Sequence, residues 1–411
     1  MSDTHDAVAD PKRDPGLTTP WFVVTIAALM ALNALAIDVM LPALDDISDA
    51  MGVAAGNDQQ LVIYVYILGF GAPQIVFGPL SDRFGRRPIL FISLLGYAAA
   101  GAVCAAAPTF STLLAARFLQ GVFASGCRVV AVSVVRDVFA GRQMARIMSL
   151  VMTLFMVVPI LAPAIGQLIL FTGPWRWIFA VLTIAGLGLL AWCALNLKET
   201  LPEAARQPLN VRASVLAYSE VLRNRVTAGY MIGSGVIFGS LFAFIGAAEQ
   251  IITEVFGKEE SFVLWFAGIA VALSAANFLN STLVERIGMR RLSHFAVFGF
   301  TILSLALWAA LTVFGERFEI FYPMFALIFA CFGLVGSNFN ALAMEPLGRI
   351  AGTASAAYGF ATTTVSSLIG WLIGSRYDGS AIPVIWGFFV LGVICLIVVL
   401  ITEQGKLFSS R

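Results

Sequence analysis

Charged residues are scarce in this chain. Asp, Glu, Lys and Arg together make up 12% of its 411 residues, whereas hydrophobic residues make up 59%. An ordinary soluble domain carries about 25% charged residues, so water cannot be the solvent for most of this surface. The net charge of +1 at pH 7 also gives no basic surface of the kind that nucleic acid requires. We therefore expect a membrane protein in contact with lipid and with no nucleic-acid partner.

Residue groups that carry chemistry in enzymes are also missing. The five cysteines lie in apolar runs without a C-x-x-C pair, and the only histidines are His5 and His294, so we expect no disulfide and no metal site. No G-x-x-x-x-G-K-[ST] motif is present, which excludes ATP hydrolysis by a P-loop. Gly186, Gly188 and Ala191 fit G-x-G-x-x-A, but they lie in an apolar run without a preceding strand. The sequence therefore predicts no enzyme activity and no cofactor.

The first residues lack the basic head of a cleaved signal peptide. Residues 1–19 are rich in aspartate and proline, and only Lys12 and Arg13 are basic. This composition predicts a disordered cytoplasmic tail, and the first apolar run is then a retained anchor.

Long apolar runs are what the chain does have. A membrane span needs about 20 mostly apolar residues. Twelve such runs are present, at 20–41, 61–80, 89–107, 110–132, 147–171, 177–197, 226–248, 261–282, 292–314, 319–342, 352–375 and 383–402. The hydrophilic stretch 198–225 falls at the midpoint. We expect an all-α membrane protein with an N-terminal six-helix half at 20–197, a linker at 198–225, a C-terminal half at 226–402 and a short tail at 403–411.

The basic residues outside the spans indicate the orientation of the chain. With the N-terminus in the cytoplasm, nineteen Lys and Arg residues fall inside and four fall outside. Cytoplasmic loops carry the excess of Lys and Arg in membrane proteins. We therefore predict that both termini are cytoplasmic.

A basic turn occurs twice, once in each half. Residues 80–87 read LSDRFGRR, and residues 283–290, which lie 203 positions later, read LVERIGMR. Repeats that span half of a multi-pass chain are typical of transporters. This repeat therefore predicts two pseudo-symmetric halves and a transporter architecture.

Two charges inside spans are the main candidate functional residues. Asp38 lies late in the first span and Arg117 lies early in the fourth, so both are expected in the outer half of the membrane. An ionisable group in a span costs at least about 2.5 kcal/mol, and it persists mainly where it lines a cavity or pairs. Asp38 is a candidate proton or substrate site that a nearby guanidinium would tune. A structural ion pair, or a group that reaches the outer interface, is the alternative.

Two further charges stand near the same spans. Arg128 follows Arg117 by eleven residues on one helix face, so it either lines the cavity or reaches the inner surface. Glu249 closes the seventh span and is either a second titrating group or an interfacial residue.

Prolines mark a candidate hinge in the fifth span. Pro159 and Pro163 are one turn apart and Gly166 follows. Membrane helices tolerate such breaks where neighbouring helices satisfy the freed carbonyls. We therefore expect this helix to bend where the two halves meet. Ordinary helix packing is the alternative.

The first basic turn is a candidate conformational latch. Its glycines permit a tight reversal, and Asp82 can cap a helix or pair with an arginine, for which Arg136 is the candidate. A positive-inside anchor without a gating role is the alternative. The latch residues are Gly78, Asp82, Arg83, Gly85, Arg86, Arg87 and Arg136.

These motifs resemble the major facilitator superfamily, and within it the drug:proton antiporters of the bicyclomycin-resistance (Bcr/CflA) type. The likeness covers residues 20–402. GPLSDRFGRRP at 78–88 is similar to the loop signature of the superfamily, and RFLQG at 117–121 is similar to its fourth-helix signature. IDVMLPAL at 37–44, VRDVF at 135–139, APAIGQ at 162–167, WRWIF at 175–179, KETLPEAAR at 198–206 and AGTASA at 351–356 add to the match.

The resemblance implies proton-coupled export of amphipathic drugs or antibiotics across the inner membrane. It implies alternating access to a central cavity, with Asp38 and Arg117 in proton coupling. The expected partners are a small amphipathic substrate, protons and membrane lipid, the proton gradient is the energy source, and a monomer is expected to suffice. A metabolite transporter of the same fold and a membrane sensor that transports nothing remain the alternatives.

Overall fold

The computed structural model describes residues 13–53, 56–206, 208 and 211–408. Within these residues the chain is helical, without strands. Eleven helices are long and apolar enough to cross a membrane, and one bent pair makes a twelfth span. The predicted tail at 1–19 lies largely outside the described residues, and so do three residues of the predicted linker, 207, 209 and 210.

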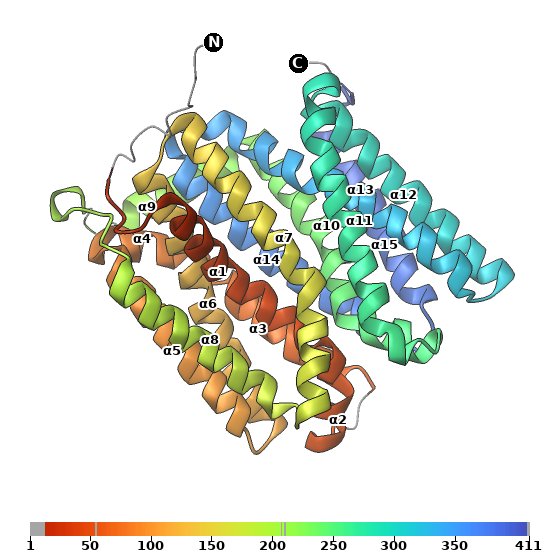
Figure 1. Ribbon diagram of the computed structural model, residues 1–411. Helices are drawn as coiled ribbons and strands as arrows, with labels where there is room; N and C mark the ends of the chain where they lie inside the picture. Colours follow the sequence, from red (N-terminus) through yellow and green to blue (C-terminus); the bar gives the residue numbers. More distant parts are fainter. Residues whose placement is uncertain (1–12, 54–55, 207, 209–210, 409–411) are drawn as a thin grey trace, which may run out of the picture.

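The first half contains six spans and one short surface helix (Figure 1). Its helices are α1 (Thr19–Asp38), α2 (Leu44–Met51), α3 (Leu61–Gly71), α4 (Gln74–Phe84), α5 (Arg86–Ala106), α6 (Phe110–Val138), α7 (Gly141–Thr172) and α8 (Arg176–Asn196). α2 had no counterpart among the predicted spans. It has only eight residues and carries Asp45 and Asp46 in its first turn. This amphipathic segment is therefore too short and too polar to be predicted as a membrane span.

The second half follows a linker helix. The linker contains α9 (Val211–Arg223), and the half contains α10 (Arg225–Gln250), α11 (Phe262–Ile287), α12 (Met289–Phe314), α13 (Phe318–Met344), α14 (Ala351–Gly374) and α15 (Ile382–Thr402). The predicted spans agree with these bounds to within a few residues, except that α6 and α11 end later, at Val138 and Ile287, and α7 begins earlier, at Gly141. The bounds of the two halves as separate domains stay predictions.

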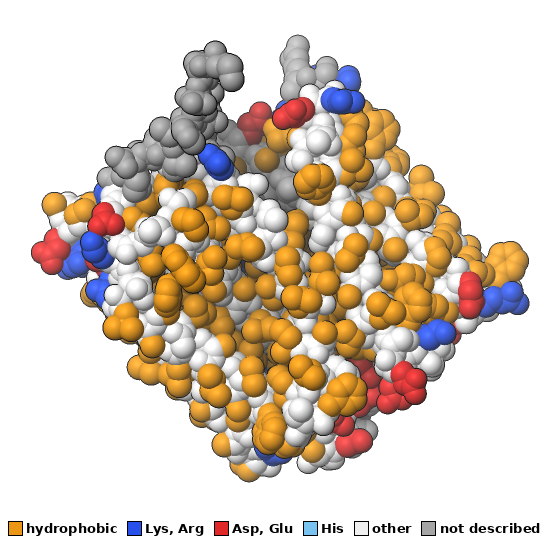
Figure 2. Space-filling view, in the orientation of Figure 1, with side chains coloured by type: hydrophobic (Ala, Val, Ile, Leu, Met, Phe, Trp, Pro, Cys, Tyr) orange, Lys and Arg blue, Asp and Glu red, His pale blue; other side chains and the backbone are white. Residues whose placement is uncertain are grey.

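Polar caps and apolar faces explain this helical pattern. Thr109 Oγ1 accepts the N–H of Thr112 at the start of α6, and Asn224 Oδ1 accepts the N–H of Thr227 at the start of α10. Hydrophobic side chains cover much of the face seen in Figure 2, and charged side chains lie mainly at its margins. Large side chains such as Phe171 and Phe278 are 78% and 77% exposed, which suits a surface solvated by lipid.

The two ends of the bundle differ. The first described residues and the end of α15 lie at the same end, which we call the terminal end, and α2 lies at the opposite end (Figure 1). The halves meet where α3 and α4 pack against α14, and where α7 packs against α11.

The second span is broken, and its break is polar. α3 (with the turn that precedes it) and α4 meet at 43° across Ala72 and Pro73. Pro73 has no N–H to donate to the carbonyl one turn earlier, that of Gly69, and the next carbonyl, that of Phe70, accepts the Gln74 Nε2 at 3.3 Å. The same Nε2 lies 3.5 Å from Thr363 Oγ1 on α14 of the other half. The break therefore lies at the contact between the halves.

Candidate functional site

Arg117 lies fully buried inside the first half and ties three helices together. Its Nε donates to the carbonyl of Val62 on α3 at 3.1 Å, and one terminal nitrogen donates to the carbonyl of Ala36 on α1 at 3.1 Å. The other terminal nitrogen donates to Gln120 Oε1 at 2.8 Å, and the guanidinium carbon lies 4.1 Å from the ring centroid of Tyr66. Carbonyl dipoles and an aromatic face thus surround this cation.

The fourth-helix motif also brings backbones close together. A Cβ at Gly121 would collide with the carbonyl oxygen of Tyr66, so only glycine allows α6 to approach α3 this closely. Near Arg117, the hydroxyls of Tyr66 and Tyr97 and the Nε2 of Gln120 are buried without a hydrogen-bond partner among the described residues. The first half therefore contains a polar interior centred on Arg117.

Asp38 ends α1 and is also buried, with 4% of its surface exposed. Among the described residues its carboxyl group makes no hydrogen bond and no ion pair, and Arg117 instead contacts the backbone of Ala36, two residues earlier. The sequence placed both charges in the same part of the bundle, and the structure agrees. The ion pair that was one alternative for these charges is not formed.

Arg128 lies further along α6 and is half-buried. Its guanidinium carbon is 5.6 Å from the ring centroid of Phe70, directly before the break in the second span. Arg128 therefore lies between the Arg117 site and the terminal end, inside the bundle.

The basic turn forms an ion-pair network at the terminal end. Arg86, at 6% exposure, donates to Asp82 Oδ1 at 2.6 Å and to Asp137 Oδ2 at 2.9 Å. The expected partner of Asp82 was Arg136, and this expectation is wrong, because Arg136 is exposed. Adjacent residues of a helix are about 100° apart, so Asp137, rather than Arg136, faces the turn.

The start of the linker completes the same network. Glu199 accepts the backbone N–H groups of Arg86 and Arg87, each at 3.0 Å, and thereby caps α5. The hydroxyl of Thr200 donates to Asp137 at 3.1 Å. Gly85 connects α4 to α5 at φ +97°, and a Cβ there would lie 2.7 Å from Glu199 Oε2, so the predicted tight reversal is confirmed. Of the other predicted latch residues, Gly78 lies within α4 and Arg83 is exposed.

The second half repeats the turn with different partners. Gly288 has φ +87° and joins α11 to α12, as Gly85 joins α4 to α5. Arg290, which corresponds to Arg87, pairs with Glu345 at 3.0 Å and with Glu403 at 3.2 Å. The repeated sequence motif therefore corresponds to a repeated backbone turn.

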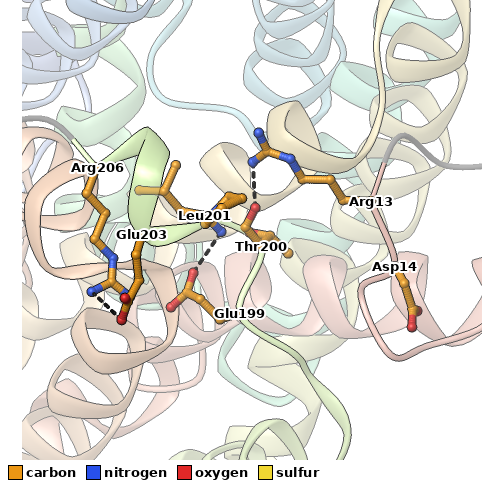
Figure 3. Close-up of a pocket in the computed structure, with 8 residues that line it drawn as sticks. Arg13, Asp14, Glu199, Thr200, Leu201, Glu203 and Arg206 are labelled. Carbon is orange, nitrogen blue, oxygen red and sulfur yellow. Dashed lines mark hydrogen bonds and ion pairs between the residues drawn. The ribbon is translucent and has the colours of Figure 1, made fainter.

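A surface cavity of about 600 Å³ opens beside the first turn at the terminal end (Figure 3). Arg13 donates to the carbonyl of Thr200 at 2.6 Å on one side, and Arg206 lies 3.7 Å from Glu203 on the other. Lys198 donates to Asp14 at 2.6 Å, which lowers the pKa of that carboxyl group below its ordinary value. Most of the residues that line this superficial cavity are charged or polar, and Asp38, Arg117 and Arg128 are not among them.

Uncharged groups join the halves at the opposite end. Gln60 Nε2 donates to Gln250 Oε1 at 2.6 Å, and Asn57 Nδ2 donates to the carbonyl of Tyr377 at 2.8 Å. The Tyr64 hydroxyl lies 3.1 and 3.0 Å from the carbonyls of Phe242 and Gly370. Sequence analysis missed these residues, because neutral polar side chains at span ends resemble ordinary interfacial residues. We call this contact the seam.

The candidate hinge in α7 is not a break in this conformation. α7 continues as one helix through Pro159 and Pro163. A Cβ at Gly166 would collide with the carbonyl of Val39, so this glycine allows α7 to lie close to the end of α1. The broken span is instead the second one, at Ala72 and Pro73.

Twelve spans in two halves, with a repeated turn and buried charges, define a multi-pass membrane transporter. The sequence matches the family described as Major Facilitator Superfamily over residues 26–371, and the chain belongs to this family. The family, the fold and the transporter class thus confirm the resemblance drawn from the motifs, and they are not those of an enzyme.

Known relatives cover nearly the whole chain. The uncharacterized MFS-type transporter YdgK of Bacillus subtilis is 32% identical over 90% of this chain and 92% of its own. The bicyclomycin resistance protein homolog of Haemophilus influenzae is 29% identical over 92% and 94%. The multidrug resistance protein MdtL of Escherichia coli is 26% identical over 94% and 96%. The crystal structure of a D-xylose-proton symporter shares the fold, with a TM-score of 0.70 at 15% identity over 92% of this chain and 96% of that one.

Proposed function

We propose that this transporter exports amphipathic small molecules, drugs among them, in exchange for protons that move inward. The relatives named for bicyclomycin and multidrug resistance support the cargo class. The excess of basic residues at the terminal end supports an inner-membrane orientation with both termini in the cytoplasm. Inward movement of one proton releases about 2.3 kcal/mol per 100 mV, which is a sufficient energy source for such exchange.

The observation that carries the proposal is the isolation of the Asp38 carboxyl group. A carboxylate buried without a donor or a cation is costly, and such a group is stable when it holds a proton. If the cargo route opens beside it, loss of that proton leaves a charge that water or a cationic part of the cargo can stabilise. Asp38 is thus suited to bind protons and cargo in turn.

Arg117 acts on Asp38 through the backbone. Its contact with the carbonyl of Ala36 fixes the last turn of α1, while its other bonds fix α3 and α6. A displacement of the last turn of α1, which carries Asp38, would therefore also displace α3 and α6 through Arg117. Arg128, half-buried and closer to the terminal end, lies where cargo entering from the cytoplasm would pass.

Closure at the seam gives the conformation in which cargo enters from the cytoplasm. The hydrogen bonds of Gln60 and Tyr64 close the outer end. The network of Asp82, Arg86 and Asp137 acts as a latch that holds the first turn in place at the inner end. Outward opening requires the seam to separate, which is alternating access between two halves.

Everted vesicles test this function. Vesicles with an acidic lumen are mixed with candidate drugs, and lumenal pH is followed with a dye. Drug-induced alkalinisation is expected for the wild type. D38N should fall to the level of vesicles without the protein, because asparagine cannot carry a proton. D46N, which changes an exposed acid on α2, is the matched control and should keep the exchange.

Two results would contradict the proposal. Unchanged lumenal pH with every drug tried would favour a metabolite transporter or a sensor. Full exchange by D38N would remove Asp38 from proton coupling while leaving the transporter class intact.

A further inference from the structure

Arg128 is a cation inside α6 without a counter-charge. Among the described residues its guanidinium forms no ion pair and no hydrogen bond, and it contacts the ring of Phe70 at 5.6 Å from the ring centroid. A charge inside a membrane span persists mainly where it pairs with another group or lines a cavity. The described chain supplies no such pair, which leaves a cavity and its ligand as the reason for this charge.

Acidic side chains lie beyond its reach at both ends of α6. Asp137 follows nine residues later, which is about 14 Å along the helix axis, and it already pairs with Arg86. Arg117 precedes Arg128 by eleven residues, or about 16 Å, and α1 with Asp38 ends beside Arg117. Neither acid can neutralise Arg128 without a change of conformation.

Glu249, the other acid that the sequence placed in a span, is also remote. It lies near the end of α10 beside Gln250, which bonds to Gln60 in the seam at the opposite end. Glu249 is buried, its Oε1 accepts the hydroxyl of Thr253 at 3.2 Å, and its Oε2 has no partner among the described residues. Its position is thus interior rather than interfacial, and its role as a titrating group stays a prediction.

Phe70 shows the direction of the Arg128 side chain. A Cβ at Gly121 would lie 2.9 Å from the backbone nitrogen of Phe70, so the ring beside the guanidinium belongs to a residue level with the middle of α6. The charge therefore stays inside the bundle and does not reach the terminal end. Arg128 is half-buried, and contact of its exposed part with hydrocarbon would be costly, so this part faces a space filled by water or cargo.

Two unpaired hydroxyls accompany the guanidinium. Ser125, one turn earlier on the same helix face, is fully buried, and its Oγ has no partner among the described residues. Thr364 on α14 approaches from the other half, because a Cβ at Gly71, next to Phe70, would lie 2.6 Å from its Oγ1. This oxygen is buried and likewise without a partner in the described part of the chain. The surroundings thus offer N–H and O–H donors to a ligand.

We propose that Arg128 binds a carboxylate of the cargo, so that the exported molecules are amphipathic acids. A carboxylate accepts two parallel N–H bonds from a guanidinium, and it can accept the hydroxyl of Ser125 or Thr364 as well. The apolar body of such a molecule can pack on the ring of Phe70. The bound anion supplies the opposite charge that Arg128 lacks within the described chain. This inference rests on the proposed export function and specifies its cargo.

Acids and their matched esters test the assignment. The probes are naproxen and ibuprofen, each compared with its own methyl ester, which keeps the apolar body and removes the charge. Binding to the purified protein in phosphatidylcholine nanodiscs is measured by isothermal titration calorimetry at neutral pH, with empty nanodiscs as the blank. The wild type should bind each acid more tightly than its ester. R128Q should bind the acids about 10- to 100-fold more weakly, because charge-assisted hydrogen bonds are lost, and should keep the affinity for the esters.

Two further variants separate the guanidinium from charge in general. R146Q, which removes an exposed arginine near the start of α7, is the matched control and should bind acids and esters like the wild type. R128K keeps the positive charge but not the planar fork of donors, so its affinity for the acids should lie between those of the wild type and R128Q.

An anionic lipid headgroup is the other source of a negative group. Replacing part of the phosphatidylcholine by phosphatidylglycerol should weaken naproxen binding no more in the wild type than in R128Q. A larger loss in the wild type would give the site to lipid and overturn the cargo assignment. A wild type that prefers neither acid to its ester, or an R128Q variant that keeps the preference, would overturn it as well. Drug-induced alkalinisation of everted vesicles would in each case leave the proposed function standing.

Discussion

Arg117 and Asp38 show how single residues are held in an apolar interior. Arg117 keeps its charge because two backbone carbonyls and the Gln120 amide oxygen accept its N–H groups. Asp38 has no such partner among the described residues. Sequence reasoning located both residues, because a charge within an apolar run is conspicuous. It could not find that Arg117 binds backbone, since carbonyl acceptors leave no mark in the sequence.

Gly85 of the first basic turn and Gly78 of α4 give a matched test at the residue scale. G85A should lower the free energy of unfolding by about 1–3 kcal/mol, because alanine is strained at this backbone conformation and its methyl group would meet Glu199. G78A should be neutral or stabilising by about 0.5–1 kcal/mol, because Gly78 lies within α4 with nothing within 4 Å of a Cβ. Apparent melting temperatures of the purified proteins measure both. Equal behaviour of the two variants would show that the turn does not require glycine.

At the scale of elements, the spans were the most predictable feature. Apolar length alone placed twelve of them near the observed bounds, because lipid requires both the length and the helix. The break at Ala72 and Pro73 was not predicted, because the apolar run at 61–80 continues through it. Two prolines within a helix can be accommodated by neighbours, whereas Pro73 begins a new helix and Gln74 satisfies the carbonyl of Phe70.

The start of α5 gives the prediction at this scale. E199A should destabilise the protein by about 1–2 kcal/mol, because the first N–H groups of the helix lose their acceptor. E203A should change stability by less than about 1 kcal/mol, because its carboxylate pairs with Arg206 only at 3.7 Å and is exposed. Thermal unfolding measures the difference. As the latch proposal requires, E199A should also slow drug turnover more than it weakens drug binding, and an unchanged rate would leave the turn a structural anchor.

At the scale of the whole molecule, the seam determines which end is closed. Its residues come from both halves, and the side chains that form its hydrogen bonds are neutral. The sequence predicted two halves from the repeated turn, but not where they touch. Contacts between halves depend on the conformation, and a sequence encodes more than one conformation of a transporter.

Tyr64 gives the prediction at this scale. Y64F removes the hydroxyl that lies within bonding distance of two carbonyls of the other half, so the seam should open more often. Y322F removes a hydroxyl that donates to the carbonyl of Trp265 within the same half, and it is the matched control. Distances between spin labels on cysteines introduced at Ala50 on α2 and Thr312 on α12, in a background without the native cysteines, should lengthen in Y64F and not in Y322F when measured by double electron–electron resonance. An unchanged distribution in Y64F would show that other seam contacts suffice.

The interruption of the second span has a mechanical consequence. Tyr64 on α3 and Gln60 in the turn before it precede Pro73, whereas Asp82 follows Pro73 on α4. α3 and α4 are not joined by a continuous helical ladder, because Pro73 has no N–H for the carbonyl of Gly69 and the Gln74 side chain serves the carbonyl of Phe70, so their mutual angle is free to change. A change of angle at this joint therefore leaves α4 anchored to α6, because Arg86 of α5 pairs with both Asp82 of α4 and Asp137 of α6.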